Sequence, residues 1–142
     1  MAAQCETRRY AAATVQIELP NQPCALAWVD DALVAATYDY VEAEGTRVGG
    51  LCLLQTETVP AVTATLELRG GYALAPRGSQ LAVATADGRV ALVDVTETLA
   101  VSKVSEPKGH LFTDVVWDGP DALIVAEGDS GRVSRWRADD GL

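Results

Sequence analysis

The stretch "LAVATADGRVALVDV", Leu81 to Val95, decides how this chain folds. Two runs of Val, Leu and Ala flank Asp87-Gly88, a dipeptide that is among the strongest local signals for a tight β-hairpin turn. A related stretch, "AATYDYVEAEGTRVGGLCLL" from Ala35 to Leu54, places a longer acidic connection between two similar apolar runs. The sequence therefore predicts the same hairpin twice, with the loop lengthened only the first time.

Strand signals continue along the rest of the 142 residues. Runs of four to eight residues rich in Thr, Val, Ile and Leu are bounded by Gly, Pro, Asp or Asn. No segment carries an i, i+3, i+4, i+7 apolar stripe over ten residues, and "EAEGTR" is too short and too interrupted by Gly to form a helix. The predicted fold class is all-β.

The charge balance excludes several function classes. The formal net charge is −9, from 20 acidic against 11 basic residues. A nucleic-acid-binding protein needs a cationic surface that displaces counterions from phosphates, and an anionic membrane surface attracts the same sign of charge. No apolar run approaches the roughly 20 residues of a membrane helix. We therefore expect neither nucleic acid nor membrane as a partner.

The cysteine and histidine content indicates an intracellular protein without a metal. The cysteines are Cys5, Cys24 and Cys52, an odd number without paired spacing, and His110 is the only histidine. These residues form neither a disulfide framework nor a zinc motif. The N-terminus has no secretory leader, because Glu6, Arg8 and Arg9 precede only a short Ala-rich run. We predict a reduced protein of the cytosol, or of the nucleus, with no cofactor.

Three segments of the chain resemble one another. With Trp28, Ala75 and Trp117 taken as equivalent, the spacings are 47 and 42 residues, and the lengthened loop accounts for the larger value. A period in the low forties with about four short strands per unit is that of a WD-repeat β-propeller blade. We predict blades at 24–68, 71–104 and 109–142. Within them, strands are predicted at 24–28, 32–37, 48–55, 61–68, 71–75, 80–85, 89–95, 98–104, 113–117, 121–126 and 132–137.

Three blades do not close a ring. Propellers typically stack roughly four to eight blades, because a single blade cannot bury both of its faces. The sequence therefore predicts an incomplete propeller: a fragment, a truncated gene product, or part of a ring that another chain completes. Residues 14–19 form an additional predicted strand that would complete a last blade from the terminus, and residues 1–13 are predicted to be disordered.

Gly109-His110 and Trp136 follow the WD-repeat layout of Gly-His before the first strand and Trp closing the third. Arg137 replaces the usual Asp after Trp, and Glu127 stands where the associated hydrogen-bond network usually has Ser or Thr, so we expect that network to be incomplete. Two interpretations of His110 remain. In the favoured one it binds the Asp of the tight turn and reaches toward Trp136. In the other it is a general base assisted by Asp114 or Asp129.

The first repeat has a distinctive hairpin. It runs through Ala36-Thr37-Tyr38, the acidic loop Asp39–Thr46, Arg47, Gly49-Gly50 and the apolar strand Leu51–Leu54, and is preceded by "LPNQPCALAW". This arrangement resembles the WD-repeat diphthine methyl ester hydrolases of diphthamide biosynthesis, over roughly Leu19 to Val95. Pro20–Pro23 departs from the family, which has a more acidic approach there. The resemblance implies hydrolysis of the methyl ester on diphthine, the modified histidine of elongation factor 2, with release of methanol. It implies no catalytic residue in this chain.

Other candidate residues have simple structural interpretations. Cys24 and Cys52 could be nucleophiles, but free Cys on an apolar strand more often behaves as a small buried hydrophobe. The acidic and aromatic loop could contact a basic partner or be a solvated hairpin loop, and we favour the latter; its residues are Tyr38, Asp39, Tyr40, Glu42 and Glu44. The remaining motifs are interpreted as turns without metal or phosphate binding: Asp30-Asp31, Asp139-Asp140, Gly49-Gly50, Asp87-Gly88 and Leu68–Gly71, the last despite its likeness to the end of ubiquitin.

Three functions stay open at this point. The first is the methyl ester hydrolase that the resemblance implies, with elongation factor 2 as its protein substrate. The second is a non-catalytic propeller that holds protein partners together, since the fold needs no chemistry to offer rigid loops. The third is a truncated fragment without a function of its own.

Overall fold

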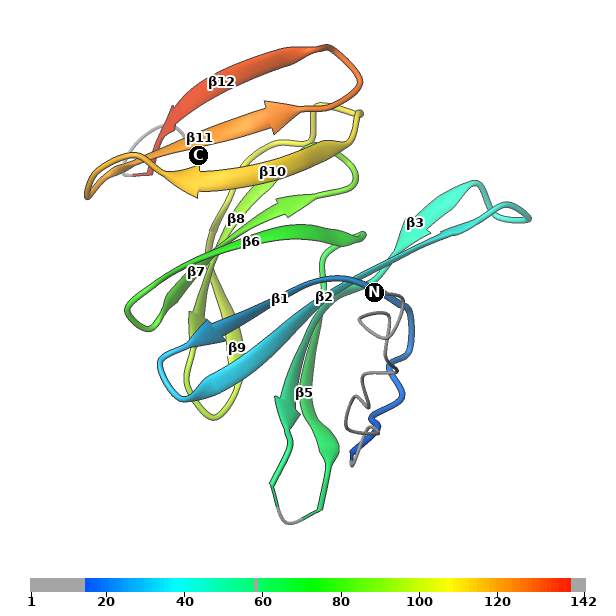
Figure 1. The fold of residues 1–142 in the computed structure, drawn as a ribbon. Coiled ribbons are helices and arrows are strands. Elements are labelled where there is room, and N and C mark those ends of the chain that lie inside the picture. The colour runs from blue at the N-terminus through cyan, green and yellow to red at the C-terminus, as the bar shows by residue number, and fades with distance from the viewer. Residues whose placement is uncertain (1–14, 58, 139–142) are drawn as a thin grey trace, which may run out of the picture.

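The computed structural model describes residues 15–57 and 59–138, and every regular element in these residues is a β-strand. The strands form three antiparallel sheets stacked along the molecule (Figure 1). The first sheet has the order β1-β2-β4-β5 with β3 paired to β2, the second β6-β7-β8-β9, and the third β10-β11-β12. The bounds are β1 Gln22–Val29, β2 Ala32–Val41, β3 Thr46–Val48, β4 Gly50–Gln55, β5 Ala61–Glu67, β6 Gly71–Arg77, β7 Gln80–Thr85, β8 Val90–Val95, β9 Leu99–Val104, β10 Phe112–Trp117, β11 Ala122–Glu127 and β12 Arg132–Arg137.

The all-β prediction is confirmed, and each predicted strand from residue 24 onward overlaps an observed one. Residues 15–19 do not form the predicted strand, because no neighbouring strand pairs with them. Thr14, the predicted disordered segment 1–13, and Asp139-Asp140 lie outside the described residues. The structure adds β3, which the sequence pattern did not indicate.

The three sheets share one pairing register. In each, the first strand contains a bulge at its second or third residue: between Pro23 and Ala25, between Gly71 and Ala73, and between Phe112 and Asp114. Counted from the bulge, the facing pairs Trp28–Leu33, Pro76–Leu81 and Trp117–Leu123 occupy matching places. The middle equivalent of the two tryptophans is therefore Pro76, and the predicted Ala75 is wrong by one residue.

The fourth strands of the first two sheets match as well. A register shift falls between Leu53 and Leu54 in one sheet and between Leu92 and Val93 in the other. At these shifts the hydroxyl of Thr63 donates to the carbonyl of Leu53, at 3.3 Å, and that of Ser102 donates to the carbonyl of Leu92, at 3.1 Å. Such agreement in irregular features indicates one structural unit repeated along the chain.

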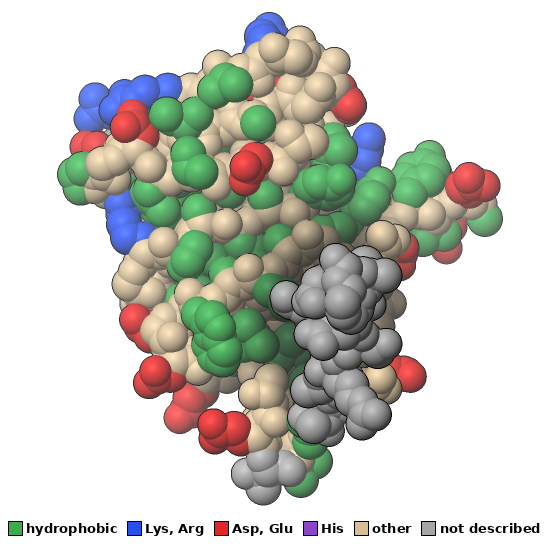
Figure 2. All heavy atoms as spheres, viewed as in Figure 1, with side chains coloured by type: hydrophobic (Ala, Val, Ile, Leu, Met, Phe, Trp, Pro, Cys, Tyr) green, Lys and Arg blue, Asp and Glu red, His purple; other side chains and the backbone are tan. Residues whose placement is uncertain are grey.

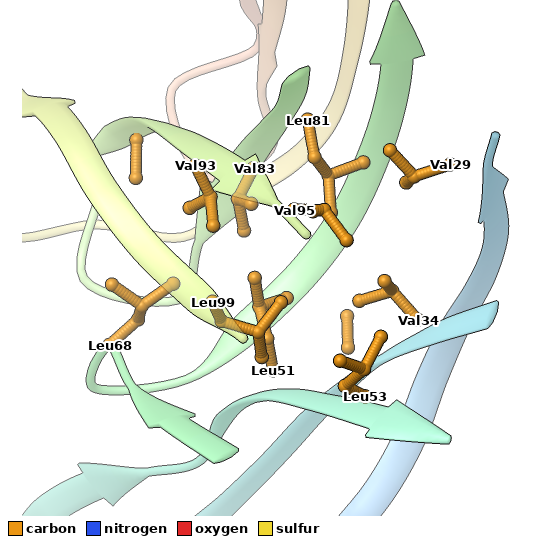
Figure 3. Packing of buried hydrophobic residues seen from close by; sticks show 12 residues of the cluster. Val29, Val34, Leu51, Leu53, Leu68, Leu81, Val83, Val93, Val95 and Leu99 are labelled. Atoms are coloured by element: carbon orange, nitrogen blue, oxygen red, sulfur yellow. The ribbon is translucent and has the colours of Figure 1, made fainter. Parts of the chain in front are cut away.

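Neighbouring sheets bury two apolar cores, each formed by the same two kinds of face. Each sheet has two faces. The front face carries Ala36 in the first sheet, Ala84 in the second and Ala126 in the third, and the back face is the opposite one. The front face of the first sheet packs on the back face of the second (Figure 3), and the front face of the second packs on the back face of the third. The first core includes Val34, Leu51, Leu53, Leu81, Val83 and Val93, and the second includes Ala75, Ala82, Leu92, Phe112, Leu123 and Val125.

The stacking follows from the strand composition. In β7 of the second sheet, the side chains on both faces are apolar. Leu81 and Val83 on one face enter the first core, and Ala82 and Ala84 on the other face enter the second. The first strands β1, β6 and β10 also contact one another in succession, and more closely than the last strands β5 and β9 contact each other (Figure 1). The sheets are thus arranged like a fan, closest together at their first strands.

Candidate functional site

A polar side chain is buried at the end of the second strand in every sheet. The residues are Thr37, Thr85 and Glu127, which hold matching places in the register. Each of them holds the hairpin that follows it. The sequence places Thr85 and Glu127 42 residues apart, the repeat spacing, which predicts that they are equivalent. The pairing confirms this and adds Thr37.

In the first two sheets this residue binds the backbone of the next strand. The amide N–H of Gly50 donates to Thr37 Oγ1 at 3.1 Å. The amide of Arg89 donates to Thr85 Oγ1 at 2.8 Å, while the Thr85 hydroxyl donates to Asp87 Oδ1 at 2.6 Å. The Arg89 guanidinium binds the same Asp87 carboxylate at 2.9 Å, so the tight turn is stabilised from both sides.

In the third sheet Glu127 takes this place and binds His110. His110 Nε2 lies 2.9 Å from Glu127 Oε1, and the glutamate side chain is only 9% exposed. Hydrogen bonds from Ser134 first, and from His110 second, hold the pKa of Glu127 below its ordinary value, against the opposing effect of burial. Glu127 is therefore a buried, ionised acceptor.

The network extends to Trp136, whose Nε1–H donates to Ser134 Oγ at 2.8 Å. The ring of Phe112 lies edge-on to both His110 and Trp136, with centroids 5.6 Å and 5.9 Å away. Glu127 and Ser134 therefore link His110 to Trp136, with a carboxylate where a hydroxyl was expected. The Asp of the tight turn, Asp129, binds the amide of Leu111 instead, so the predicted contact between His110 and this Asp is wrong. The sequence signal was the Gly-His and Trp spacing.

The acids expected to assist His110 bind elsewhere. Asp129, in the tight turn after β11, accepts from the amide of Leu111 at 3.3 Å, and Asp114 accepts from the amide of Val115 at 2.9 Å. Ser134 and His110 both bind the carboxylate of Glu127, so the order is hydroxyl, carboxylate and imidazole rather than the nucleophile, base and acid order of a serine hydrolase. The geometry favours the structural interpretation of His110.

The two described cysteines are poor nucleophiles. Cys52 is buried, and burial raises the pKa of its thiol. Cys24 is exposed, and partial burial first, then the nearby Asp39 carboxylate, raise the pKa of its thiol. Because the thiolate is the reactive form, both side chains are held in the less reactive state. Cys5 lies outside the described residues.

The acidic insert of the first repeat is a projecting hairpin. β2 continues to Val41 and pairs with β3, with Tyr40 opposite Arg47, so the two strands extend away from the stacked sheets (Figure 1). Tyr40 is 52% exposed near the tip. At the base, the Tyr38 ring lies edge-on to Tyr72 with centroids 5.9 Å apart. The hairpin is thus anchored on the second sheet and presents its acidic end to solvent.

The remaining motifs are turns, as the sequence indicated. Leu68–Gly71 connects β5 to β6, with Arg69 and Gly70 both at positive φ, and the amide of Gly70 bonds to the carbonyl of Gly49 at 2.9 Å. Asp30-Asp31 forms the two-residue connection between β1 and β2. Among residues 15–57 and 59–138, no group of three or more His, Cys, Asp or Glu side chains is placed to hold a metal ion.

One cluster escaped the sequence analysis. Arg47 of β3, together with Arg69 and Arg89 from two separate turns, lines a concavity of about 580 Å³ that also includes Ser105. Arg89 is already engaged there by Asp87 and by the carbonyl of Leu68. No local pattern could have indicated this cluster, because it forms only when the first two sheets pack together.

The search for membrane-spanning helices found none in the described part of the chain with the length and apolarity required.

Comparison with known proteins informs the fold alone. No protein-family model matches the sequence, and no curated protein matches it. Among solved structures, the computationally designed Ika8 protein matches with a TM-score of 0.52 at 16% identity, over 84% of this chain and 47% of that one. The computationally designed Ika4 protein matches with a TM-score of 0.50 at 13% identity, over 89% of this chain and 99% of that one. This chain therefore spans less than half the length of Ika8.

Proposed function

We propose that the three sheets are consecutive blades of an incomplete WD-repeat β-propeller. The shared register, the recurring bulge and the repeated front-to-back packing support this arrangement. The contacts of β1 with β6 and of β6 with β10 would place the first strands around a central axis, as in propellers. The third sheet would lack its fourth strand within the described residues.

On this architecture, the proposed function is hydrolysis of the methyl ester on diphthine of elongation factor 2. Water adds to the ester carbonyl and the bond from the carbonyl carbon to the methoxy oxygen breaks. Methanol is released, and a carboxylate remains on the modified histidine. The observation that carries the proposal is the first-repeat hairpin, in which Thr37 binds Gly50 and the acidic β2–β3 extension projects to solvent. No residue of this chain is assigned a catalytic role.

The projecting hairpin suits a protein substrate. Asp39, Glu42 and Glu44 place negative charge along it, with the exposed ring of Tyr40 beside them. Such a surface is complementary to a basic patch on a partner, which it would steer by charge and anchor by the aromatic ring. The extension occurs in only one of the three repeats, which indicates a purpose other than holding the sheets together.

The direct test is to incubate the protein with elongation factor 2 that carries methylated diphthine. We expect mass spectrometry to show the loss of one methyl ester, with methanol in the supernatant. A variant in which Asp39, Glu42 and Glu44 become Asn, Gln and Gln should lower the rate through weaker substrate binding, and this effect should diminish at high salt. An unchanged substrate mass with the folded wild-type protein would refute the hydrolase.

The second candidate is a propeller that binds protein partners without catalysis. It is favoured by the His110–Glu127 pair, which engages the histidine in the fold, and by the protonated thiols. Recovery of a stable complex without turnover would support it. Accumulation of the methyl ester in cells that lack the gene would count against it. A non-functional fragment, the third option, predicts that circular dichroism shows no cooperative melting of β-structure.

A further inference from the structure

Two sheet faces have no partner sheet within the described residues: the back face of the first sheet and the front face of the third. On the former, Leu26 is 65% and Trp28 61% exposed. On the latter, Val116 is 50% and Val133 72% exposed. A front face packs against a back face in both apolar cores of the chain, and the two uncovered faces are one of each kind. A front face and a back face are therefore available at opposite ends of the stack (Figure 1).

The contact that would join them has a direct precedent in the molecule. Trp117 on the back face of the third sheet donates its Nε1–H to the carbonyl of Ala75 in the preceding sheet, at 2.9 Å. The register makes Trp28 the equivalent of Trp117, and Val116 the equivalent of Ala75. Trp28 has no hydrogen-bond partner for its indole N–H among the residues that the structure describes. The carbonyl of Val116 on another molecule would supply that partner.

The first-sheet end is strongly acidic, whereas the third sheet carries charges of both signs. Residues 15–68, which include the first sheet, contain one basic residue, Arg47, against eight acidic ones. Asp30 and Asp31 lie in the turn beside Trp28. The front face of the third sheet carries Arg135 and Arg137 on β12 and Asp114 on β10. Arg135 is paired with Asp118 at 2.7 Å, and Arg137 lies 4.0 Å from Asp121. In Figure 2 both Lys or Arg and Asp or Glu side chains are visible toward the third sheet.

We propose that a second copy of this chain docks its first sheet on the third sheet of the first copy, and does the reverse at the other end. This inference rests on the propeller architecture proposed above. A head-to-tail contact used twice between two copies closes a ring with two-fold symmetry, and three sheets from each copy give a ring of six. That number lies within the roughly four to eight blades that propellers use.

The experiment is sedimentation equilibrium of the full 142-residue chain and of two single variants, Val133→Glu and Trp28→Glu. The wild type should sediment as a dimer. Each variant changes one face in both copies, so both contacts between the copies are weakened. The dissociation constant of the dimer should rise roughly 100-fold, because a charge is buried at each contact without a partner. Val59→Glu, an exposed position in the β4–β5 turn, is the matched control and should remain dimeric.

Mixing the two variants identifies the geometry. A Val133→Glu copy retains its first sheet and a Trp28→Glu copy retains its third, so an equimolar mixture should form a heterodimer through one intact contact. Circular dichroism is the folding control: only variants that have the wild-type spectrum are compared. A monomeric wild type, a mixture that stays monomeric, or a Trp28→Glu variant that remains a dimer would each overturn the proposal.

The outcome is separate from that of the hydrolase assay. A monomeric wild type that still removes the methyl ester would overturn self-assembly and leave the proposed function standing. A wild-type dimer with the expected mixing behaviour and no turnover would support the ring and refute the hydrolase.

Discussion

The second sheet and the third sheet have the same register, yet their burial differs. In the second sheet, Leu81, Ala82, Val83 and Ala84 are all fully buried, because a neighbouring sheet covers each face. In the third sheet, the residues of β11 alternate, with Leu123 and Val125 buried and Ile124 and Ala126 half-buried. The comparison teaches that the strand pattern determines the pairing, whereas the neighbours determine how much each strand contributes to stability.

The largest expected effect compares one position in two sheets. Leu81 is fully buried between the first and second sheets, and Leu33 at the matching place of the first sheet is half-buried. Leu81→Ala should lower the free energy of unfolding by about 2–5 kcal/mol, since it removes apolar contacts and leaves a cavity. Leu33→Ala should cost about 1 kcal/mol. Urea denaturation measures both, and equal losses would contradict the difference in packing.

A second comparison concerns two glycines at positive φ. Gly88 has φ 82°, and a Cβ there would lie 2.4 Å from the carbonyl oxygen of His110, in the segment that leads into the third sheet. Gly78 has φ 58° with no atom within 4 Å of that position. Gly88→Ala should therefore destabilise by about 3 kcal/mol and Gly78→Ala by about 1 kcal/mol. Thermal melting checks the order, and a smaller loss at Gly88 would contradict the close approach.

The third comparison is between Glu127 and Thr37, which hold the same place in different sheets. The pKa of Glu127 is lowered in the folded state, so its contribution is present above the unfolded pKa near 4.5 and is lost as pH falls through the folded value. Glu127→Gln should cost about 1–2 kcal/mol near neutral pH, and the loss should shrink in acid. Thr37→Val should cost the same at each pH, because the Thr37 hydroxyl is bonded to the backbone amide of Gly50. Denaturation at several pH values separates the two, and a pH-independent loss for Glu127→Gln would contradict the lowered pKa.

The smallest expected effect concerns the two equivalent tryptophans. The Arg77 guanidinium lies 3.4 Å from the ring centroid of Trp117, whereas the ring of Trp28 is 61% exposed. A double-mutant cycle with Arg77→Met and Trp117→Leu should give a coupling energy of about 1 kcal/mol. The same cycle with Trp28→Leu in place of Trp117→Leu should give none, and coupling there would show that the two sites are linked through the sheets.

Much of the fold was predictable from local patterns. Alternating Val, Leu and Ala runs with Gly and Asp between them located the strands that have a partner in the same repeat. The strand predicted at Thr14–Leu19 is wrong over residues 15–19. Its residues alternate as in a strand, but no neighbouring strand pairs with them. β3 was missed because the acidic sequence around Glu42 and Glu44 has the composition of a loop, and only the continuation of β2 beyond Thr37 creates its partner.

The polar network was partly predictable. The spacing between His110 and Trp136 indicated that the two belong together, but the exchange of an expected hydroxyl for Glu127 hid the acceptor. The misplaced equivalence of Ala75 has another cause: Pro76, which holds the matching place in the register, does not resemble the tryptophans that it matches. Bulges and packing between sheets leave no local sequence signal, which is why the arginine cluster was also missed.

The meander connectivity has a consequence for biosynthesis. Apart from the β2–β4 pair, which the short strand β3 separates in the sequence, every strand pairs with its neighbours along the chain. A sheet can therefore assemble from hairpins as the polypeptide emerges from the ribosome, without waiting for distant segments. The first sheet would then serve as a template on which the second condenses, and the second would serve the third. Folding would proceed vectorially from the N-terminal end, with each newly made surface sheltered by the segment synthesised next.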